Sequence, residues 1–236
     1  MVSWQEEQMQ VLLGAKTESE FFDVLSAIAR KLGFDYCAYG MRMPLPLAEP
    51  RLIMLNNYSA AWQQRYETED YLAIDPTVAH GKRTTMPFVW SDDALDTCQA
   101  FWEDAESHGL KVGWAQSCYD ARGVGGMLTL ARSNDHLSDK ELDDISLKMS
   151  WLALAAHQIL SRLLIPKCMP EAAADLTARE IEVLRWTADG KTSSEVGEIM
   201  RISERTVNFH VNSTLLKLGA SNKTAAVIKA AILGLL

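Results

Sequence analysis

Two asparagines near the C-terminus, Asn208 and Asn212, are four residues apart in a segment with helical periodicity. Side chains at that spacing point the same way from a helix, and an asparagine amide can make two hydrogen bonds to the edge of an adenine in the DNA major groove. Arg205 and Phe209 fall on the same face. The apolar residues gather on the adjoining side: Val207, Val211, Leu215 and Leu218. Both asparagines could instead be solvated surface residues, but asparagine is a poor helix former, so the pattern favours base recognition.

Positive charge is available around the same helix for the phosphates of DNA. Arg205, Lys217 and Lys223 are candidate phosphate contacts, together with the backbone amides at the helix start, where Ser203 and Thr206 lie. The whole chain carries a net charge of −8, but its last 32 residues hold four basic residues and no acidic one. A phosphate backbone senses that local charge rather than the total.

No group of residues in the chain matches a common catalytic or metal site. The five histidines are scattered, no Gly-x-Ser-x-Gly elbow occurs, and no two histidines have the spacing of a zinc-binding helix. The four cysteines are far apart, without the paired spacing of a zinc site or a disulfide framework. We therefore expect no enzyme, no metal and no cofactor.

The sequence also lacks the features of a membrane or secreted protein. No apolar run is long enough to span a bilayer. The first ten residues include two glutamates and no basic residue, unlike a secretory signal. We expect a cytoplasmic protein without a membrane partner.

Short helices must position the asparagine face, and their start signals are clear. Ser or Thr followed three residues later by Glu is a capping box that begins a helix, and it occurs at Thr177 and Thr192. Only Arg201 and Ile202 separate the second of these helices from Ser203, a favourable N-cap for the next one. Two helices joined by so tight a turn are typical of a helix-turn-helix. A last helix completes the predicted bundle.

The N-terminal part mixes strands and helices without a regular β-α-β alternation. Five strands are predicted, over Tyr36–Met43, Arg51–Asn56, Pro87–Trp90, Lys111–Tyr119 and Gly123–Arg132. Capping boxes at Thr17 and Ser138 predict helices before and after the strands. Two further helices are expected, over Ala60–Tyr71 and Thr97–His108. This order predicts an antiparallel sheet with helices packed on its faces.

The helix that begins at Ser138 is expected to be long and to end near Leu164, because Pro166 and Pro170 follow. Apolar residues repeat along it as in a coiled-coil seam: Ile145, Met149, Leu152, Ala156, Ile159 and Leu163. A second apolar face holds Leu147, Trp151 and Leu154. We expect one face to pack on the sheet and the other to serve a dimer.

The C-terminal motifs resemble the LuxR-type DNA-binding domain. The resembling stretches are Leu176-Thr-Ala-Arg-Glu-Ile-Glu-Val-Leu, Trp186-Thr-Ala-Asp-Gly-Lys-Thr and Ile202-Ser-Glu-Arg-Thr-Val-Asn-Phe-His-Val. The N-terminal part resembles the acyl-homoserine lactone receptors that carry this domain, at Asn57, Tyr58, Trp62, Tyr66, Tyr71, Asp75, Pro76, Trp90 and Gly113. The resemblance implies an α-β-α sandwich that encloses one lactone signal, in a homodimer that reads a palindromic DNA site.

The resemblance also implies how the signal is held. Trp62 would donate its indole N–H to the lactone carbonyl, and Tyr58 and Thr129 would bond the acyl carbonyl. Asp75 would accept the ligand amide N–H, so Asp75→Asn is expected to be milder than Asp75→Ala. Without the resemblance, Trp62 reads equally as the buried face of an amphipathic helix, and Asp75 before a proline as an ordinary turn.

The remaining pocket residues would be apolar walls. The resemblance implies that Tyr66 and Trp90 enclose the head group. We expect Ala38, Gly40 and Met127 to line the acyl tail, with the long methionine side chain adapting to it.

The sequence thus predicts an α+β chain with three parts. Residues 1–165 would be the lactone-binding and dimerisation domain, 166–175 a linker, and 176–236 an all-α helix-turn-helix domain. The predicted function is a quorum-sensing transcriptional regulator whose partners are the lactone, double-stranded DNA, a second copy of the chain and, for an activator, RNA polymerase. Two alternatives stay open: a regulator with a vestigial pocket or another signal, and a lactone-degrading enzyme.

Overall fold

Two separate units make up the chain in the computed structural model, which describes residues 3–90 and 98–236. The first unit holds the described residues up to 163, apart from two short segments, 43–51 and 121–123. Those two segments and residues 164–236 make up the second unit.

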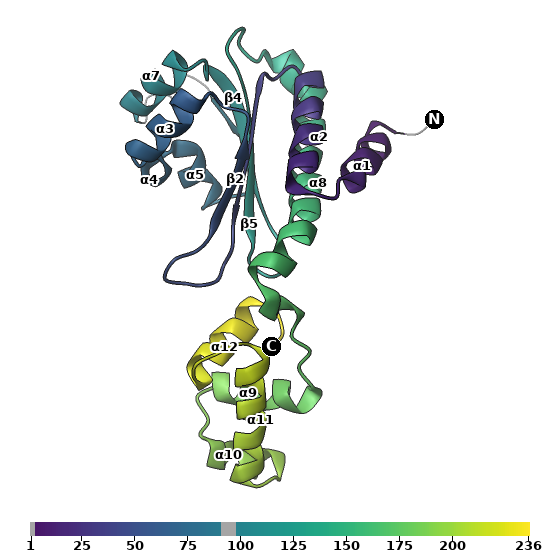
Figure 1. Cartoon of the computed structure of the whole chain (residues 1–236), viewed down its shortest axis with the longest axis vertical. Coiled ribbons are helices and arrows are strands. Elements are labelled where there is room, and N and C mark those ends of the chain that lie inside the picture. The colour runs from purple at the N-terminus through teal and green to yellow at the C-terminus, as the bar shows by residue number, and fades with distance from the viewer. Residues whose placement is uncertain (1–2, 91–97) are drawn as a thin grey trace. The chain divides into compact units, whose positions relative to one another are not determined.

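A five-stranded sheet forms the middle layer of the first unit (Figure 1). Its strands run in the order β2 (Leu52–Asn56), β1 (Tyr36–Arg42), β5 (Gly125–Arg132), β4 (Val112–Tyr119) and β3 (Phe88–Val89). Every neighbouring pair is antiparallel. The antiparallel sheet and its five predicted strands are confirmed, with strand ends shifted by one or two residues.

Helices cover both faces of this sheet, which confirms the predicted α-β-α layers (Figure 1). One face carries α3 (Ala60–Thr68), α4 (Tyr71–Ile74), α5 (Pro76–Gly81) and α7 (Gln99–Ser107). The other face carries α2 (Glu18–Lys31) and α8 (Asp139–Cys168), with α1 (Trp4–Gly14) outside them. Thr97, the predicted start of the helix now seen as α7, lies outside the described residues. Helices α1, α4 and α5 were not predicted.

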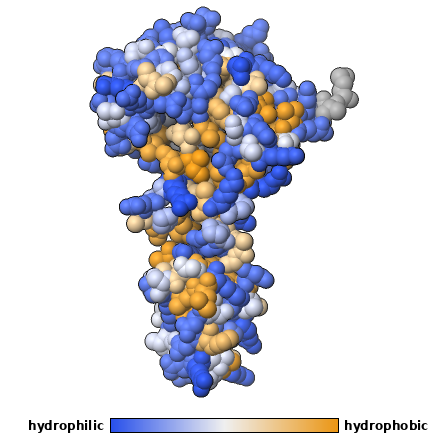
Figure 2. All heavy atoms as spheres, in the orientation of Figure 1, coloured by the Kyte–Doolittle hydropathy of each residue, from blue (hydrophilic) through white to orange (hydrophobic). Residues whose placement is uncertain are grey.

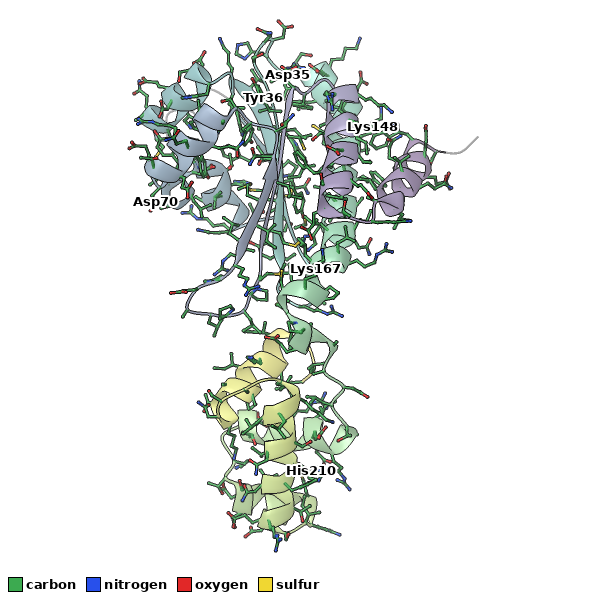
Figure 3. All side chains as sticks on the ribbon, viewed as in Figure 1. Asp35, Tyr36, Asp70, Lys148, Lys167 and His210 are labelled. Carbon is green, nitrogen blue, oxygen red and sulfur yellow. The ribbon has the colours of Figure 1, made fainter. Side chains whose placement is uncertain are left out.

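The predicted seam of α8 is mostly buried, and its second apolar face is partly covered by α1. The ring of Trp151 meets that of Trp4, with centroids 5.5 Å apart. Lys148, labelled in Figure 3, places its ammonium 6.0 Å from the Trp4 ring centroid. Leu147 and Leu154 stay 79% and 58% exposed. Figure 2 shows other apolar residues reaching the surface of this unit among hydrophilic ones.

Helix α8 does not end near Leu164, so that prediction is wrong. It continues through Pro166 to Cys168, and a short 3₁₀ helix, η1 (Pro170–Ala173), follows. The backbone N–H of Met169 donates to the carbonyl of Ile165 over 2.8 Å, and Leu164, Ile165 and Met169 are all buried. We attribute the extra turn to this burial, which outweighs the helix-breaking tendency of proline.

Four helices form the C-terminal bundle: α9 (Ala178–Ala188), α10 (Ser193–Met200), α11 (Glu204–Lys217) and α12 (Lys223–Ile232). The capping boxes at Thr177 and Thr192 are complete, with both reciprocal hydrogen bonds. At Thr17 and Ser138 the hydroxyl caps the helix, but the glutamate bonds elsewhere, so these two boxes are only half formed. A box at Ser3, missed in the sequence, begins α1.

Candidate functional sites

A cavity of about 280 Å³ lies in the first unit between the sheet and helices α3, α5 and α7. All nine residues predicted to contact a signal line this cavity: Ala38, Gly40, Tyr58, Trp62, Tyr66, Asp75, Trp90, Met127 and Thr129. Nine further lining residues were not predicted: Met54, Asn56, Gln63, Glu67, Thr77, Val78, Phe101, Ala105 and Leu110. Sequence signals existed for some of them, because Met54 and Asn56 alternate along a predicted strand and Phe101 and Ala105 are four apart in a predicted helix.

The floor of the cavity follows from the strand register. Ala38 pairs with Asn56 on one side and with Thr129 on the other, so these three residues form one row across β2, β1 and β5. Two residues further along β1, Gly40 pairs with Met54 and Met127 in a second row. Alternate residues of a strand face the same side, so both rows lie on the cavity face. Small residues in the central strand leave room above it.

Several hydrogen-bond donors on the lining residues have no protein partner in the described part of the chain, among them the indole N–H groups of Trp62 and Trp90 and the hydroxyls of Tyr58 and Thr129. Trp62 and Thr129 are buried, at 3% and 7% exposed. Burial raises the pKa of Tyr58 well above its usual range, and the neighbouring Cys37 and Asp75 add to the shift. Tyr58 therefore stays a protonated donor. A buried donor without a hydrogen-bond partner destabilises the folded state. These donors are therefore available to bond acceptors on a ligand.

Asp75 supplies a buried acceptor to the cavity and also begins a helix. Its Oδ1 accepts hydrogen bonds from the backbone N–H and the hydroxyl of Thr77, at 2.8 and 2.7 Å, which caps α5. Its Oδ2 accepts from the Tyr66 hydroxyl at 2.9 Å. Burial raises the pKa of Asp75, while the bonds from Thr77 and Tyr66 oppose that shift. A carboxylate oxygen can accept more than one bond, so Oδ2 retains capacity for a ligand N–H.

Aromatic rings wall the rest of the cavity. The Trp62 ring lies 5.7 Å from those of Tyr66 and Tyr71 and 6.0 Å from that of Phe101, centroid to centroid. Trp90 packs flat against the backbone of Gly113, where a Cβ atom would come within 2.5 Å of the ring. Only glycine fits beneath Trp90, which gives a physical reason for the glycine in the motif.

The second candidate site is the surface of α11, held against α10 by a tight turn. Arg201 adopts a left-handed conformation with φ of 55° to end α10, and the Ser203 hydroxyl accepts the Thr206 N–H to begin α11. At Gly197 a Cβ would lie 2.8 Å from the carbonyl oxygen of Ile202. This glycine, which sequence reasoning missed, is what lets the turn close on α10.

The outer face of α11 presents the predicted base-reading residues. Arg205, Asn208, Phe209 and Asn212 are exposed, Phe209 at 68%. The predicted apolar side is buried in the bundle: Val207, Val211 and Leu218, with Leu215 half-buried.

Some of the predicted phosphate contacts already have partners within the bundle. Lys217 pairs through its ammonium with Glu180 at 2.8 Å and also donates to the carbonyl of Asp175. Its charge is compensated within the bundle, and its role as a phosphate contact stays a prediction. Thr206 is half-buried, with its hydroxyl 2.8 Å from that of Ser203. Lys223 is half-buried at the start of α12, with its ammonium 3.5 Å from the Ser193 hydroxyl.

Residues 3–90 and 98–236 show neither a membrane-spanning helix nor a metal site. None of the helices there is long and apolar enough to cross a membrane. No group of three or more His, Cys, Asp or Glu side chains there could hold a metal ion.

Comparison with known proteins finds two family matches and close relatives. Residues 17–160 match the autoinducer binding domain, and residues 174–230 match the bacterial regulatory proteins of the luxR family. The chain is 49% identical to the transcriptional activator protein AnoR of Acinetobacter nosocomialis over 100% of both chains.

Solved structures agree with these matches. The crystal structure of Escherichia coli SdiA has a TM-score of 0.84 at 32% identity, covering 98% of this chain and 97% of SdiA. A structure of SdiA in complex with octanoyl-rac-glycerol has a TM-score of 0.81 at 31% identity, covering 97% and 93%. CepR2 of Burkholderia cenocepacia, described as an N-acylhomoserine lactone dependent LuxR family transcription factor, has a TM-score of 0.61 at 34% identity, covering 66% of this chain and 92% of its own. With both family domains matched in order and a relative aligned from end to end, the chain belongs to the LuxR-type quorum-sensing transcriptional regulators.

Proposed function

We propose that the chain binds an acyl-homoserine lactone in the cavity of its first unit and, as a homodimer, recognises palindromic promoter DNA. The observation that carries the proposal is the set of polar groups in the cavity. Donors on Trp62, Tyr58 and Thr129, which have no protein partner among the described residues, line the cavity together with the buried carboxylate of Asp75. An acyl-homoserine lactone offers two carbonyl oxygens, one amide N–H and an apolar tail, which match donors, acceptor and apolar walls.

Each residue takes a role in this proposal. Trp62 donates to the lactone carbonyl, Tyr58 and Thr129 to the acyl carbonyl, and Asp75 accepts the amide N–H. Tyr66 and Trp90 enclose the head group. Ala38, Gly40 and Met127 line the acyl tail. CepR2, which is 34% identical and is described as an N-acylhomoserine lactone dependent transcription factor, supports this class of signal.

The domains divide the work in the proposal. Residues 1–165 bind the signal and dimerise, 166–175 connect, and 176–236 bind DNA. Arg205, Asn208, Phe209 and Asn212 face the bases, while Ser203, Thr206 and Lys223 serve the phosphates. AnoR, at 49% identity, is named an activator, and on that support the proposal extends to activation, with RNA polymerase as a further partner in the cytoplasm.

Mass spectrometry of small molecules extracted from the purified chain tests the signal. Protein produced with a mixture of acyl-homoserine lactones should retain one of them, intact and in near-stoichiometric amount. Recovery of a monoacylglycerol instead would favour another signal class. The extract is analysed for monoacylglycerols too, because SdiA has been solved in complex with octanoyl-rac-glycerol. Recovery of only the ring-opened lactone would favour an enzyme.

A gel-shift titration of the lactone-loaded chain tests the DNA side. Asn208→Ala should weaken binding to a palindromic site by about 1–3 kcal/mol if the amide makes two bonds to a base, and should leave binding to random DNA nearly unchanged. Equal losses on both DNAs would contradict base recognition by Asn208.

A further inference from the structure

Two methionines stand at one end of the cavity floor with a glycine between them. Gly40 on β1 pairs with Met54 on β2 and with Met127 on β5, and both methionines line the cavity. The polar row that holds Thr129 is two residues away along the strands, a step of about 6.6 Å. An acyl chain whose carbonyl meets Thr129 therefore reaches the methionine row after a few methylene groups.

The first methionine, Met54, lies over Gly40. A Cβ at Gly40 would lie 3.6 Å from Cε of Met54 and 3.8 Å from its Sδ. The Met54 side chain thus lies where it would just touch a Cβ added to β1 at Gly40. It is 42% exposed, so this wall of the cavity borders solvent on its other side.

Gly81, the last residue of α5, fixes the second methionine from behind. A Cβ there would come within 3.3 Å of Sδ of Met127 and 3.1 Å of Cβ of Ser117. Ser117 is held by a 2.8 Å hydrogen bond from its hydroxyl to the carbonyl of Thr84, so the flexible Met127 thioether is the neighbour that can move further. Gly81 is buried, does not line the cavity and has no positive φ, so alanine is tolerated by its backbone.

We propose that Met127, held in place by Gly81, sets the length of the acyl chain that the cavity accepts, with Met54 as the opposite wall. This inference rests on the proposed function. A side chain added at Gly81 displaces the Met127 thioether away from α5 and into the cavity that Met127 lines, which shortens the tail space. Gly81 is then a specificity-determining residue that never touches the signal.

The experiment measures half-maximal concentrations of butanoyl-, hexanoyl-, octanoyl-, decanoyl- and dodecanoyl-homoserine lactone in a reporter strain that carries the full chain. Gly81→Ala should move the preferred chain toward shorter lactones, with about a fourfold loss for each methylene group that no longer fits. Met127→Ala should move the preference toward longer ones. In the double variant the effect of Gly81→Ala should vanish, because the displaced side chain is gone.

Met41→Ala is the matched control, since Met41 lies one residue along β1 from Gly40, on the opposite face, and is fully buried. It should lower soluble yield without changing the order of the lactones. If Gly81→Ala prefers the lactones in the same order as the wild type, the inference is overturned while the proposed function stands. If Gly81→Ala is insoluble, the same outcome in Met127→Ala overturns the inference. A wild-type chain that answers none of the five lactones overturns the proposed function and this inference with it.

Discussion

Asp75 shows how one side chain can serve both the fold and a ligand. One oxygen of the carboxylate caps α5 through Thr77, and the other accepts the Tyr66 hydroxyl at the cavity wall. The sequence offered these as competing explanations, a turn or a binding residue. The structure shows the turn and places Asp75 in the cavity lining, and its two oxygens have different partners, so a substitution must be judged at each oxygen separately.

That geometry changes the expected result of replacing Asp75. In Asp75→Asn the amide oxygen should stay on Thr77, whose N–H and hydroxyl both donate to that side. The amide nitrogen then faces the ligand N–H, donor against donor. We expect lactone affinity to fall about ten- to hundred-fold with unchanged stability of the ligand-free chain. The Asn variant is therefore not the mild one that sequence reasoning suggested.

Asp75→Ala should lose the same ligand contact and also the helix cap, which is worth about 1 kcal/mol. Reporter dose responses and thermal melting of the ligand-free chain separate the two effects. An Asn variant that responds to lactone like the wild type would show that Asp75 does not bond the amide N–H.

Single residues of the site could be predicted from the sequence where they belong to a recognisable motif. The nine cavity residues proposed from the sequence all line one cavity. The pairing of Lys217 with Glu180, which is 37 residues away, was not predicted, because a single sequence does not reveal pairs at that distance. Gly197 was missed because the close approach of Ile202 exists only once the turn has formed.

At the scale of elements, the tie between α9 and α11 depends on one buried carboxylate. Glu180 accepts hydrogen bonds from Lys217, from the Ser213 hydroxyl and from the Thr177 N–H. Burial alone would raise the pKa of Glu180, but these bonds outweigh it and lower the pKa to about 2. Between about pH 4 and pH 2, the folded chain therefore keeps Glu180 ionised. In the unfolded chain, whose glutamate pKa is about 4.3, the same carboxylate would bind a proton in that range.

A carboxylate whose pKa is lower in the folded state stabilises the folded chain at pH values above its unfolded pKa. This stabilisation is lost as the pH falls toward 2. Glu180→Gln should lower the unfolding free energy of the bundle at neutral pH by roughly 1–3 kcal/mol. In this variant the unfolding free energy should also fall less steeply between about pH 5 and 2 than in the wild type. Glu182→Gln is the control, because Glu182 lies on the same helix in an exposed pair with Arg179. Thermal melting by circular dichroism at stepped pH measures both, and parallel pH profiles for the two variants would contradict the assignment.

Elements were predictable where local signals and packing agreed. The helices after Thr177, Thr192 and Ser203 begin where their caps predict. Helix α1 was missed although Ser3 and Glu6 form a complete box, because α1 is short and shows no clear apolar stripe. The end of α8 was wrong because buried residues on both sides of Pro166 favour helix there, and burial is a tertiary effect.

At the scale of the whole molecule, the proposed function links a signal to DNA by stability. A ligand that binds only the folded chain stabilises it by about 2.7 kcal/mol at one hundred times its dissociation constant. A dimer then places two copies of α11 about one turn of DNA apart. This step needs a surface on which two chains meet, and the first unit offers one on α8.

Leu147 and Leu154 are seven residues apart on α8 and leave 79% and 58% of their surfaces exposed. Replacing both with glutamate should change the stability of a single chain little, since neither is buried, but should oppose an apolar contact between two copies. We expect the lactone-loaded variant to elute as a monomer in light-scattering chromatography and to lose its preference for a palindrome over a single half-site. Met86→Glu, at a residue 67% exposed on another part of the unit, should leave both properties unchanged. If the Leu147→Glu/Leu154→Glu chain remains dimeric, the dimer contact lies elsewhere. If it is monomeric and still binds lactone with wild-type affinity, the dimer surface is not needed for lactone binding in the cavity.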